Sequence, residues 1–397
     1  MNVTKSLLLL SLLLVQKVIV AQAWIQIDDF PSVERDDAIN FVIGETAYCG
    51  TGLKPAFIPS NDMHAFDMNT ETWSTISSLP AGTERQYATG FSYNNYGFVF
   101  GGIGSDYFND LWMYDPANGN WQAKMSLPAE GRMGSSCFVI NDTAYIVGGR
   151  TSLLNSISEV WAYCISADTW TQKSNLPFGS RWRASTATDN AKGFLAFGVD
   201  SESNFRRELY EFNPLINAWS QLSVFPGAGR AYAAMNYING ELLVIAGLDS
   251  LSNSYNDMWK INPTELIWQE LDTIPASRRR GGLCFNSATT IYYSTGIDLN
   301  NNRLKETWKL YNPTALKDVH WNDEVNIYPN PANGFIEIET NLINCTVSIV
   351  EITGKLISSE KIVQQKTYIE LSNHSKGIYL IRLETGDKII TKKLILH

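Results

Sequence analysis

Three arginines that could bind an anion lie near one another in the middle of the chain, although the whole chain carries a formal net charge of −9. They are Arg183, Arg206 and Arg207, and Glu202 stands among them. A guanidinium group binds a carboxylate through paired hydrogen bonds that lysine does not reproduce. The sequence therefore predicts an anion-binding site built on these residues.

Repetition in the sequence adds residues to this candidate ligand-binding site. Tyr87 and Tyr232 occupy the same position in their repeats as Arg183 does in its own, and Arg280 follows a loop of the same kind. Binding residues concentrate on loops that a rigid scaffold positions. We expect one face of the fold, around a channel mouth, to carry Arg183, Arg206, Arg207, Tyr232 and Arg280, with Tyr87 and Glu202 nearby. Such a basic, aromatic-lined mouth predicts a carboxylated sugar or an acidic peptide as the ligand.

Other charged residues recur in every repeat and need a different explanation. The arginines are Arg35, Arg85, Arg132, Arg181, Arg230 and Arg279, and the acids are Asp62, Asp110, Glu159, Glu208, Asp257 and Glu306. Arginine and acid are 27 residues apart in five repeats and 25 in the second. Side chains that recur in every unit usually hold the unit together. We therefore expect structural ion pairs or hydrogen bonds between neighbouring units.

The residues needed for metal or nucleophilic chemistry are scarce. The chain has 4 His, of which His64 alone lies in the repeats, and there it takes the place of an aromatic ring. We expect a packed ring at His64, no metal site and no cofactor, because zinc and copper sites need several converging His or Cys ligands. The 5 Cys are widely spaced and predict free, mostly buried thiols rather than a disulfide framework. The acidic balance also argues against nucleic-acid binding.

The elements that position these residues follow from a repeat in the tryptophans. Neighbouring copies are 48 or 49 residues apart, at Trp24, Trp73, Trp121, Trp170, Trp219 and Trp268. A glycine ends a hydrophobic run in the same phase at Gly52, Gly102, Gly149, Gly198, Gly247 and Gly296. A period of this length is typical of β-propellers, in which each repeat forms one four-stranded blade.

The third repeat shows the four strands of the unit. Strands are predicted over Ser135–Ile140, Thr143–Val147 and Glu159–Ile165, and a fourth begins near Trp170. Asn141-Asp142 is a two-residue turn of the kind that needs positive φ, and Asn94-Asn95 and Asn239-Gly240 are its equivalents. The glycine after the second strand is expected to leave room for a large ring.

These features resemble the kelch-repeat family. The resemblance is clearest in GRMGSSCFVINDTAYIVGG (131–149) and NDLWMYDPANGNW (109–121), and it covers residues 24 to about 318. It departs where Phe197, Ala246 and Thr295 replace the first glycine of the pair. The resemblance implies an all-β, six-bladed propeller over residues 24–321. Because the last repeat lacks a fourth strand, the strand that begins at Trp24 should complete the sixth blade.

A second domain is expected from residue 322 to residue 397. The repeat stops there, and short alternating segments predict a small, immunoglobulin-like β-sandwich. The segments YPNPANG (328–334), VSIVEITGKLI (347–357), SKGIYLIRL (375–383) and KKLIL (392–396) resemble the type A sorting domain of the type IX secretion system. The resemblance implies passage through the periplasm and recognition by that secretion machinery at the outer membrane of a Gram-negative bacterium.

Residues 1–23 read as a signal peptide. Lys5 precedes a short apolar stretch, and Ala21-Gln22-Ala23 offers a small-residue cleavage site. No later segment is apolar enough to predict a transmembrane span. The sequence thus predicts a protein that is secreted or held at the outer cell surface.

The sequence favours a non-catalytic module that binds a protein or a glycan over an enzyme. No motif in the sequence requires a catalytic function, and loops around a channel mouth are suited to binding a protein or a glycan. The alternative is an enzyme that resembles the sialic-acid mutarotases (N-acetylneuraminate epimerases), which are exported six-bladed kelch propellers. They use acidic and Arg side chains on loops, for which Glu202 with Arg206 or Arg207 is the nearest match. A structural adhesin is a third possibility that the sequence does not separate from the first.

Overall fold

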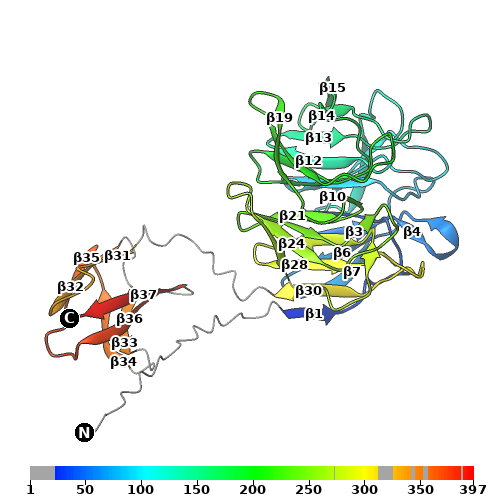
Figure 1. Ribbon diagram of the computed structural model, residues 1–397. Coiled ribbons are helices and arrows are strands. Elements are labelled where there is room, and N and C mark those ends of the chain that lie inside the picture. The colour runs from blue at the N-terminus through cyan, green and yellow to red at the C-terminus, as the bar shows by residue number, and fades with distance from the viewer. Residues whose placement is uncertain (1–22, 272, 312–324, 341–344, 352–355, 386–387) are drawn as a thin grey trace, which may run out of the picture. The chain divides into compact units, whose positions relative to one another are not determined.

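Figure 1 shows the computed structural model, which describes residues 23–271, 273–311, 325–340, 345–351, 356–385 and 388–397. The chain divides into two compact units, residues 1–315 and 316–397. The predicted signal peptide, apart from Ala23, and the predicted boundary near residue 322 lie outside the described residues. Within the described ranges, no helix is long and apolar enough to cross a membrane.

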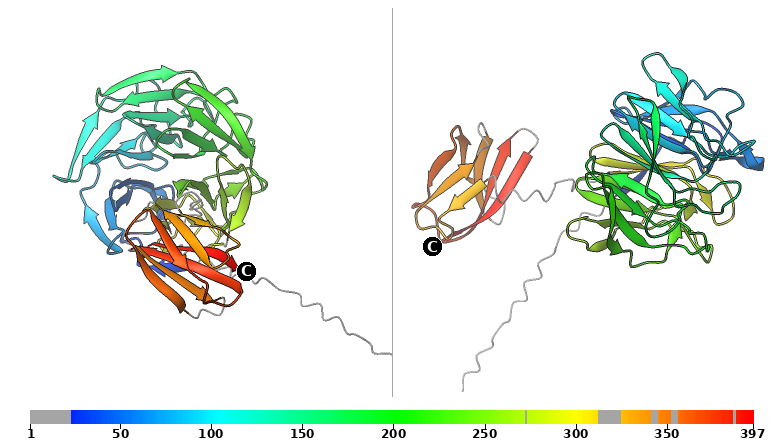
Figure 2. Two further views of the ribbon diagram at one scale, coloured as in Figure 1. Left: turned by 90° about the vertical axis from the view of Figure 1, so that its left-hand side faces the viewer. Right: turned by 90° about the horizontal axis from the view of Figure 1, so that it is seen from above.

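Six four-stranded antiparallel sheets form the first unit, and the left view of Figure 2 shows them arranged in a ring. Blade 1 is β2 (Ile39–Ile43), β3 (Thr46–Gly50), β6 (Met63–Asp67) and β7 (Thr72–Ile76); blade 2 is β8 (Thr89–Tyr93), β9 (Tyr96–Phe100), β10 (Leu111–Asp115) and β11 (Asn120–Lys124); blade 3 is β12 (Ser136–Ile140), β13 (Thr143–Val147), β14 (Val160–Cys164) and β15 (Thr169–Lys173). Blade 4 is β16 (Ser185–Thr188), β17 (Gly193–Ala196), β18 (Glu208–Asn213) and β19 (Ala218–Val224); blade 5 is β21 (Ala234–Ile238), β22 (Glu241–Ile245), β24 (Met258–Ile261) and β25 (Trp268–Leu271). The predicted all-β propeller fold is confirmed.

The sixth blade joins the two ends of the propeller. Its strands are β27 (Leu283–Asn286), β28 (Thr290–Ser294), β30 (Thr307–Tyr311) and β1 (Ala23–Ile27), in that order. β1 pairs antiparallel with β30, with Trp24 opposite Leu310, and Trp24 is only 9% exposed. The N-terminal strand therefore closes the ring, as the repeat phase predicts. Since Ala23 pairs with Tyr311, the chain enters and leaves the propeller at the same end of this blade.

Two kinds of loop contain short strand pairs and one turn: those that join the second strand of a blade to its third, and those that join each blade to the next. These elements are β4 (Leu53–Lys54) with β5 (Ile58–Pro59), β20 (Arg230–Ala231) with β23 (Leu248–Asp249), β26 (Arg279–Arg280) with β29 (Ile297–Asp298), and the 3-10 turn η1 (Pro55–Phe57). These loops emerge at the end of the propeller opposite to the entry and exit of the chain. They form the loop face of the propeller, a term used below for this end.

Aromatic side chains pack the blades against each other. Trp170, on the outer strand of blade 3, lies 5.5 Å from the Phe100 ring of blade 2, and its Nε1 donates to the Met125 carbonyl at 2.7 Å. Trp121 donates to the Ser77 carbonyl of blade 1 at 2.9 Å in the same way. A Trp near the start of each outer strand thus fixes a blade to its predecessor, which explains the period that the sequence shows.

A glycine recurs at the end of the second strand of each blade for a different reason from the one expected. Gly102 and Gly149 have φ of +99° and +109°, and a Cβ there would lie 2.8 Å from the Gln86 carbonyl oxygen and 2.5 Å from Ser135 Oγ. Positive φ and the close approach of the neighbouring loop, rather than a ring, exclude larger residues at this position. The predicted turn at Asn141 does have positive φ, 51°.

The second unit is a β-sandwich, as predicted. One sheet holds β31 (Val325–Tyr328), β32 (Phe335–Thr340) and β35 (Lys366–Glu370), and the other holds β34 (Leu356–Ile362), β33 (Cys345–Glu351), β36 (Gly377–Thr385) and β37 (Lys388–Leu396). Their inner faces bury one cluster that includes Ile336, Ile349, Ile381 and Leu394. The sequence did not predict β34, a largely polar edge strand, or β31.

Candidate functional site

The recurring arginines and acids pair as predicted, and they serve the blades. Five pairs lie 2.6 to 2.9 Å apart: Arg35–Asp62, Arg85–Asp110, Arg132–Glu159, Arg230–Asp257 and Arg279–Glu306. Each of these arginines is at most 1% exposed. The same carboxylates accept hydrogen bonds from ring N–H groups, such as Trp112 Nε1 at 2.7 Å from Asp110. Most of these groups are engaged inside the blades, although Arg132 Nη1 and Arg230 Nε are buried without a described hydrogen-bond partner.

Blade 4 departs from this arrangement. Arg181 Nη2 is 3.9 Å from Glu208, because Arg206 Nη2 occupies that carboxylate at 2.9 Å. Arg206 Nη1 also lies 3.6 Å from Asp200. Arg206 is therefore held in the loop by two acids rather than presented as a free cation.

Six residues, each two positions after a recurring arginine, surround the axis of the ring. They are Asp37, Tyr87, Gly134, Arg183, Tyr232 and Gly281, and all have φ between 54° and 63°. The N–H of one donates to the carbonyl of the preceding one around the ring, at 2.9 Å for Asp37 to Gly281, 3.1 Å for Tyr87 to Asp37, 2.8 Å for Gly134 to Tyr87, 2.7 Å for Arg183 to Gly134 and 3.4 Å for Tyr232 to Arg183. We call these six residues the axial ring. Left-handed backbone at Asp, Tyr and Arg is costly and clusters at functional sites.

Arg183 is the central side chain of the axial ring. Its guanidinium carbon lies 3.5 Å from the Tyr232 ring centroid, 3.9 Å from that of Tyr87 and 4.1 Å from that of Trp182. The residue is 8% exposed, and its Nε and Nη1 are buried without a hydrogen-bond partner among the described atoms. Buried N–H groups of a cation are costly to leave unpaired, so this position favours an added acceptor.

Asp37 stands on the opposite side of the axial ring, three blades from Arg183. Burial raises the pKa of Asp37 to about 7; the charge of Arg183 opposes this shift and the neighbouring charge of Asp36 adds to it. Asp36 is itself bound by Arg303 Nε at 2.6 Å. Below about pH 7 Asp37 therefore keeps its proton and does not neutralise Arg183.

The two glycines of the axial ring make space for these side chains. A Cβ at Gly134 would lie 3.1 Å from Arg183 Cγ, and a Cβ at Gly281 would lie 2.7 Å from Asp37 Oδ1. Two glycines and four residues with polar or aromatic side chains thus share one repeat position, so blade packing does not require a single residue type there.

The structure brings together four of the seven residues in the sequence-predicted site. Arg183, Tyr87 and Tyr232 are in contact, and the Arg280 guanidinium carbon lies 5.6 Å from the Tyr232 ring centroid. The other three, Arg206, Arg207 and Glu202, belong to the loop between β17 and β18. Arg207 and Glu202 are exposed there, and no described contact joins the three to Arg183.

The sequence reasoning missed Asp37 and Trp182. Asp37 stands in the same phase as Arg183, so extending the comparison of Tyr87 and Tyr232 to the first repeat would have found it. Trp182 precedes Arg183 directly, but it follows no repeat pattern, and only the fold shows that its ring packs on the guanidinium. His64 is a packed ring as expected, 4% exposed and 5.0 Å from Phe30.

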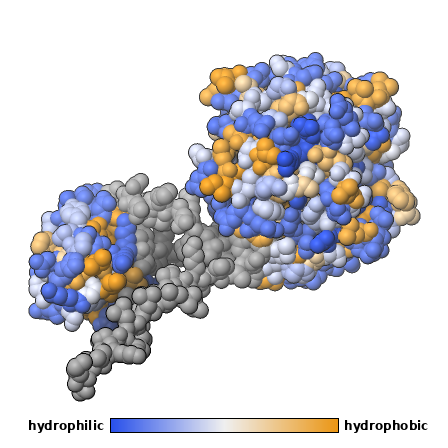
Figure 3. Space-filling view, in the orientation of Figure 1, coloured by the Kyte–Doolittle hydropathy of each residue, from blue (hydrophilic) through white to orange (hydrophobic). Residues whose placement is uncertain are grey.

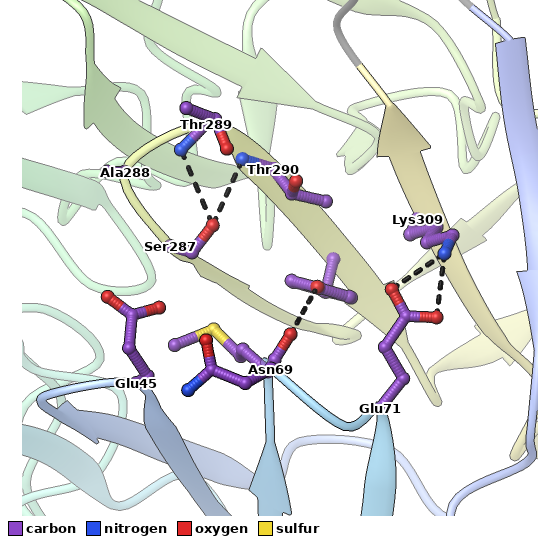
Figure 4. A pocket seen from close by; sticks show the side chains of 10 residues that line it. Glu45, Asn69, Glu71, Ser287, Ala288, Thr289, Thr290 and Lys309 are labelled. Carbon is purple, nitrogen blue, oxygen red and sulfur yellow. Dashed lines mark hydrogen bonds and ion pairs between the residues drawn. The ribbon is translucent and has the colours of Figure 1, made fainter. Parts of the chain in front are cut away.

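A separate depression of about 480 Å³ lies at the joint between the first and last blades, at the end opposite to the loop face (Figure 4). Lys309 of β30 contacts both oxygens of Glu71 at 2.6 Å, and Tyr292 donates to the Met68 carbonyl at 3.4 Å. Both contacts cross from blade 6 to blade 1. These contacts join the two blades, so the residues that line the depression stabilise the ring closure.

Exposed hydrophobic residues on the loop face lie on the loops of different blades. Phe57, Leu153 and Leu251 are 75 to 80% exposed, each on a loop of a different blade. Figure 3 likewise shows scattered hydrophobic groups within a hydrophilic surface on the side of the propeller that faces the viewer.

Among the described residues, no group of His, Cys, Asp and Glu could hold a metal ion. Burial raises the pKa of the Cys49, Cys137 and Cys284 thiols, which keeps them unreactive.

Comparison with protein families gives two matches. Residues 47–258 match the Attractin/LZTR1 beta-propeller, and residues 326–397 match the secretion system C-terminal sorting domain. The second match covers the four segments that suggested a sorting domain in the sequence.

Individual relatives match part of the chain, and one solved structure matches its fold. N-acetylneuraminate epimerase of Shigella sonnei (strain Ss046) is 33% identical over 111 residues, and that of Escherichia coli (strain K12) is 32% identical over the same length. Each match covers 26% of this chain and 29% of the relative, so the chain spans under a third of these curated proteins. The solved structure of YjhT has a TM-score of 0.63 and 18% identity, covering 71% of this chain and 95% of that one. At that identity, the likeness concerns the fold alone.

Proposed function

This chain belongs to the Attractin/LZTR1 β-propeller family, and we propose that it is a secreted or cell-surface binding module whose axial ring binds a carboxylate-bearing glycan or peptide. One observation carries this proposal: Arg183 is buried on the ring axis between aromatic rings with two N–H groups unpartnered. A carboxylate would satisfy those donors and the charge that Asp37 leaves uncompensated.

The attachment of the propeller supports this role. The chain enters at β1 and leaves at β30, at the end opposite to the loop face. The axial ring precedes the first strand of each blade, so it belongs to the loop face. The chain ends of the propeller and the axial ring therefore lie at opposite ends of this unit.

A calorimetric titration of the full chain with N-acetylneuraminate, preceded by a screen of acidic and neutral glycans, tests the proposal. We expect binding that Arg183→Ala weakens at least tenfold, and that the methyl ester of the same sugar does not show. Arg207→Ala is the matched control, because Arg207 is an exposed arginine outside the axial ring. Retained binding in Arg183→Ala, or its loss in Arg207→Ala, would contradict the proposed site.

An enzyme similar to the N-acetylneuraminate epimerases is the second candidate. The curated relatives support it over part of their length, and Asp37 has a raised pKa that suits proton exchange near neutral pH. The test is the rate at which freshly dissolved α-N-acetylneuraminate converts to the β anomer, followed by NMR. Acceleration by the wild-type chain that Asp37→Asn abolishes would favour the enzyme, whereas binding without acceleration leaves the binding module.

A further inference from the structure

One outer face of the sorting domain is apolar where an exposed sheet face is usually polar. In the four-stranded sheet Ile378 pairs with Ile395, Leu380 pairs with Lys393 and with Val350, and Val350 pairs with Leu356. Directly paired residues point to the same side of a sheet. Five side chains therefore form one contiguous group, which we call the apolar patch: Val350, Leu356, Ile378, Leu380 and Ile395.

The apolar patch lies outside the core cluster of the sandwich, although Val350 at its centre is only 8% exposed. The alternate residues of the same strands, such as Ile349, Ile381 and Leu394, are at most 1% exposed inside the sandwich. In contrast, Leu356 is 57% exposed and Ile378 is 45% exposed. Figure 3 shows hydrophobic side chains at the surface of this unit. Because the described residues leave Leu356 and Ile378 largely uncovered, the patch is suited to contact with another molecule.

The outer face of the opposite sheet is different in kind. Tyr328 donates to Glu337 at 2.8 Å and Lys366 pairs with Glu337 at 3.0 Å, so these polar groups engage one another. Tyr368, opposite Glu337 in the register, is 64% exposed. Phe335 is also 49% exposed in this sheet, so hydrophobic side chains lie on both outer faces, but those of the opposite sheet stand among charged residues.

The edge of the apolar patch is basic. Lys393 is exposed and stands beside Leu380 in the register. The strand that carries it is fixed in place by Asn330 of the YPNPANG segment, which donates to the Lys393 carbonyl at 2.7 Å and accepts from the Ile395 N–H at 2.9 Å. This clamp holds Lys393 and Ile395 at defined positions on the face of the sheet.

We propose that the apolar patch, with Lys393 at its edge, is the surface by which the sorting domain docks on the secretion machinery at the outer membrane. The segments that match the sorting family supply it: 347–357 gives Val350 and Leu356, 375–383 gives Ile378 and Leu380, and 392–396 gives Lys393 and Ile395. The partner surface is apolar and carries a carboxylate opposite Lys393. The proposal does not depend on the ligand of the propeller.

Fractionation of a Gram-negative host with a type IX system, expressing the full chain, tests this proposal. We expect Leu356→Ser with Ile378→Ser to lower the exported fraction at least fivefold and to leave the chain in the periplasm. Tyr368→Ser is the matched control, an exposed aromatic on the opposite sheet, and should be exported like wild type. Normal export of the double variant, or an equal defect in Tyr368→Ser, overturns the proposal.

A charge reversal keeps the test decisive if the double variant fails to fold. Lys393→Glu alters one exposed side chain and no core contact, and we expect it to reduce export at least threefold. Resistance of the periplasmic chain to trypsin reports folding of the sorting domain in each variant. Normal export of a folded Lys393→Glu chain overturns the proposed acidic partner. Ligand titration of the same material separates a failure of docking from a failure of the propeller site.

Discussion

Replacing Arg85 by Ala should destabilise the propeller far more than the same change at Arg181, although the two residues occupy equivalent positions. Arg85 donates to the Thr83 and Gly101 carbonyls at 2.8 Å and, through both terminal nitrogens, to Asp110 at 2.7 Å. Its loss strands a half-buried carboxylate and two carbonyls, which costs about 3–5 kcal/mol when a buried ion pair is broken.

Arg181 makes weaker contacts, so its loss should cost less. It donates to the Ser180 carbonyl at 2.8 Å, and its nearest carboxylate, on Glu208, is 3.9 Å away and already bound by Arg206. Removing one hydrogen bond of this kind costs about 1–2 kcal/mol. Because both arginines are at most 2% exposed, the cavities left by the two changes are similar and largely cancel in the comparison.

Urea unfolding of the full chain, followed by tryptophan fluorescence, measures the difference. Of the 12 Trp, 11 lie in the described propeller, and Trp321 follows it, so the signal reports mainly on the propeller. We expect Arg85→Ala to lose at least about 2 kcal/mol more than Arg181→Ala. Equal losses, or a loss below about 1 kcal/mol for Arg85→Ala, would refute the assignment of the recurring arginines to blade stability.

Three further outcomes follow from the structure. Trp24→Ala should lower the free energy of unfolding by about 3–5 kcal/mol, because Trp24 is buried in the closing strand, and an unchanged urea midpoint would contradict this. The raised pKa of Asp37 means that the folded chain keeps a proton that the unfolded chain releases, so stability should fall relative to Asp37→Asn as pH rises from about 4 to about 7; parallel pH profiles would exclude it. A chain ending at residue 325 should keep the melting temperature of the propeller but remain in the periplasm, and its appearance in the medium would speak against the sorting role.

The architecture could be predicted because it repeats. Trp, Gly, Arg and acidic residues recur at the same positions because every blade has the same packing contacts. The last repeat lacks a fourth strand, which predicted that the strand at Trp24 completes it. The glycine phase was found for the wrong reason: backbone conformation and the approach of the Gln86 loop, not a neighbouring ring, require it. The polar edge strand β34 was missed because exposure on an edge removes the alternation by which strands are recognised.

The sequence by itself determined the blade count, the roles of the recurring charges and the position in each repeat that is free to vary. Only the tertiary structure decided which varied residues meet. Asp37 and Arg183 are nearly 150 residues apart in the sequence, and the ring places them across one axis, where burial changes the protonation of the one and leaves donors of the other unpartnered. Arg206, which the sequence grouped with Arg183, instead forms ion pairs with Glu208 and Asp200. Residue type and spacing fix local chemistry, but desolvation and competition for a shared carboxylate depend on neighbours that only the closed ring supplies.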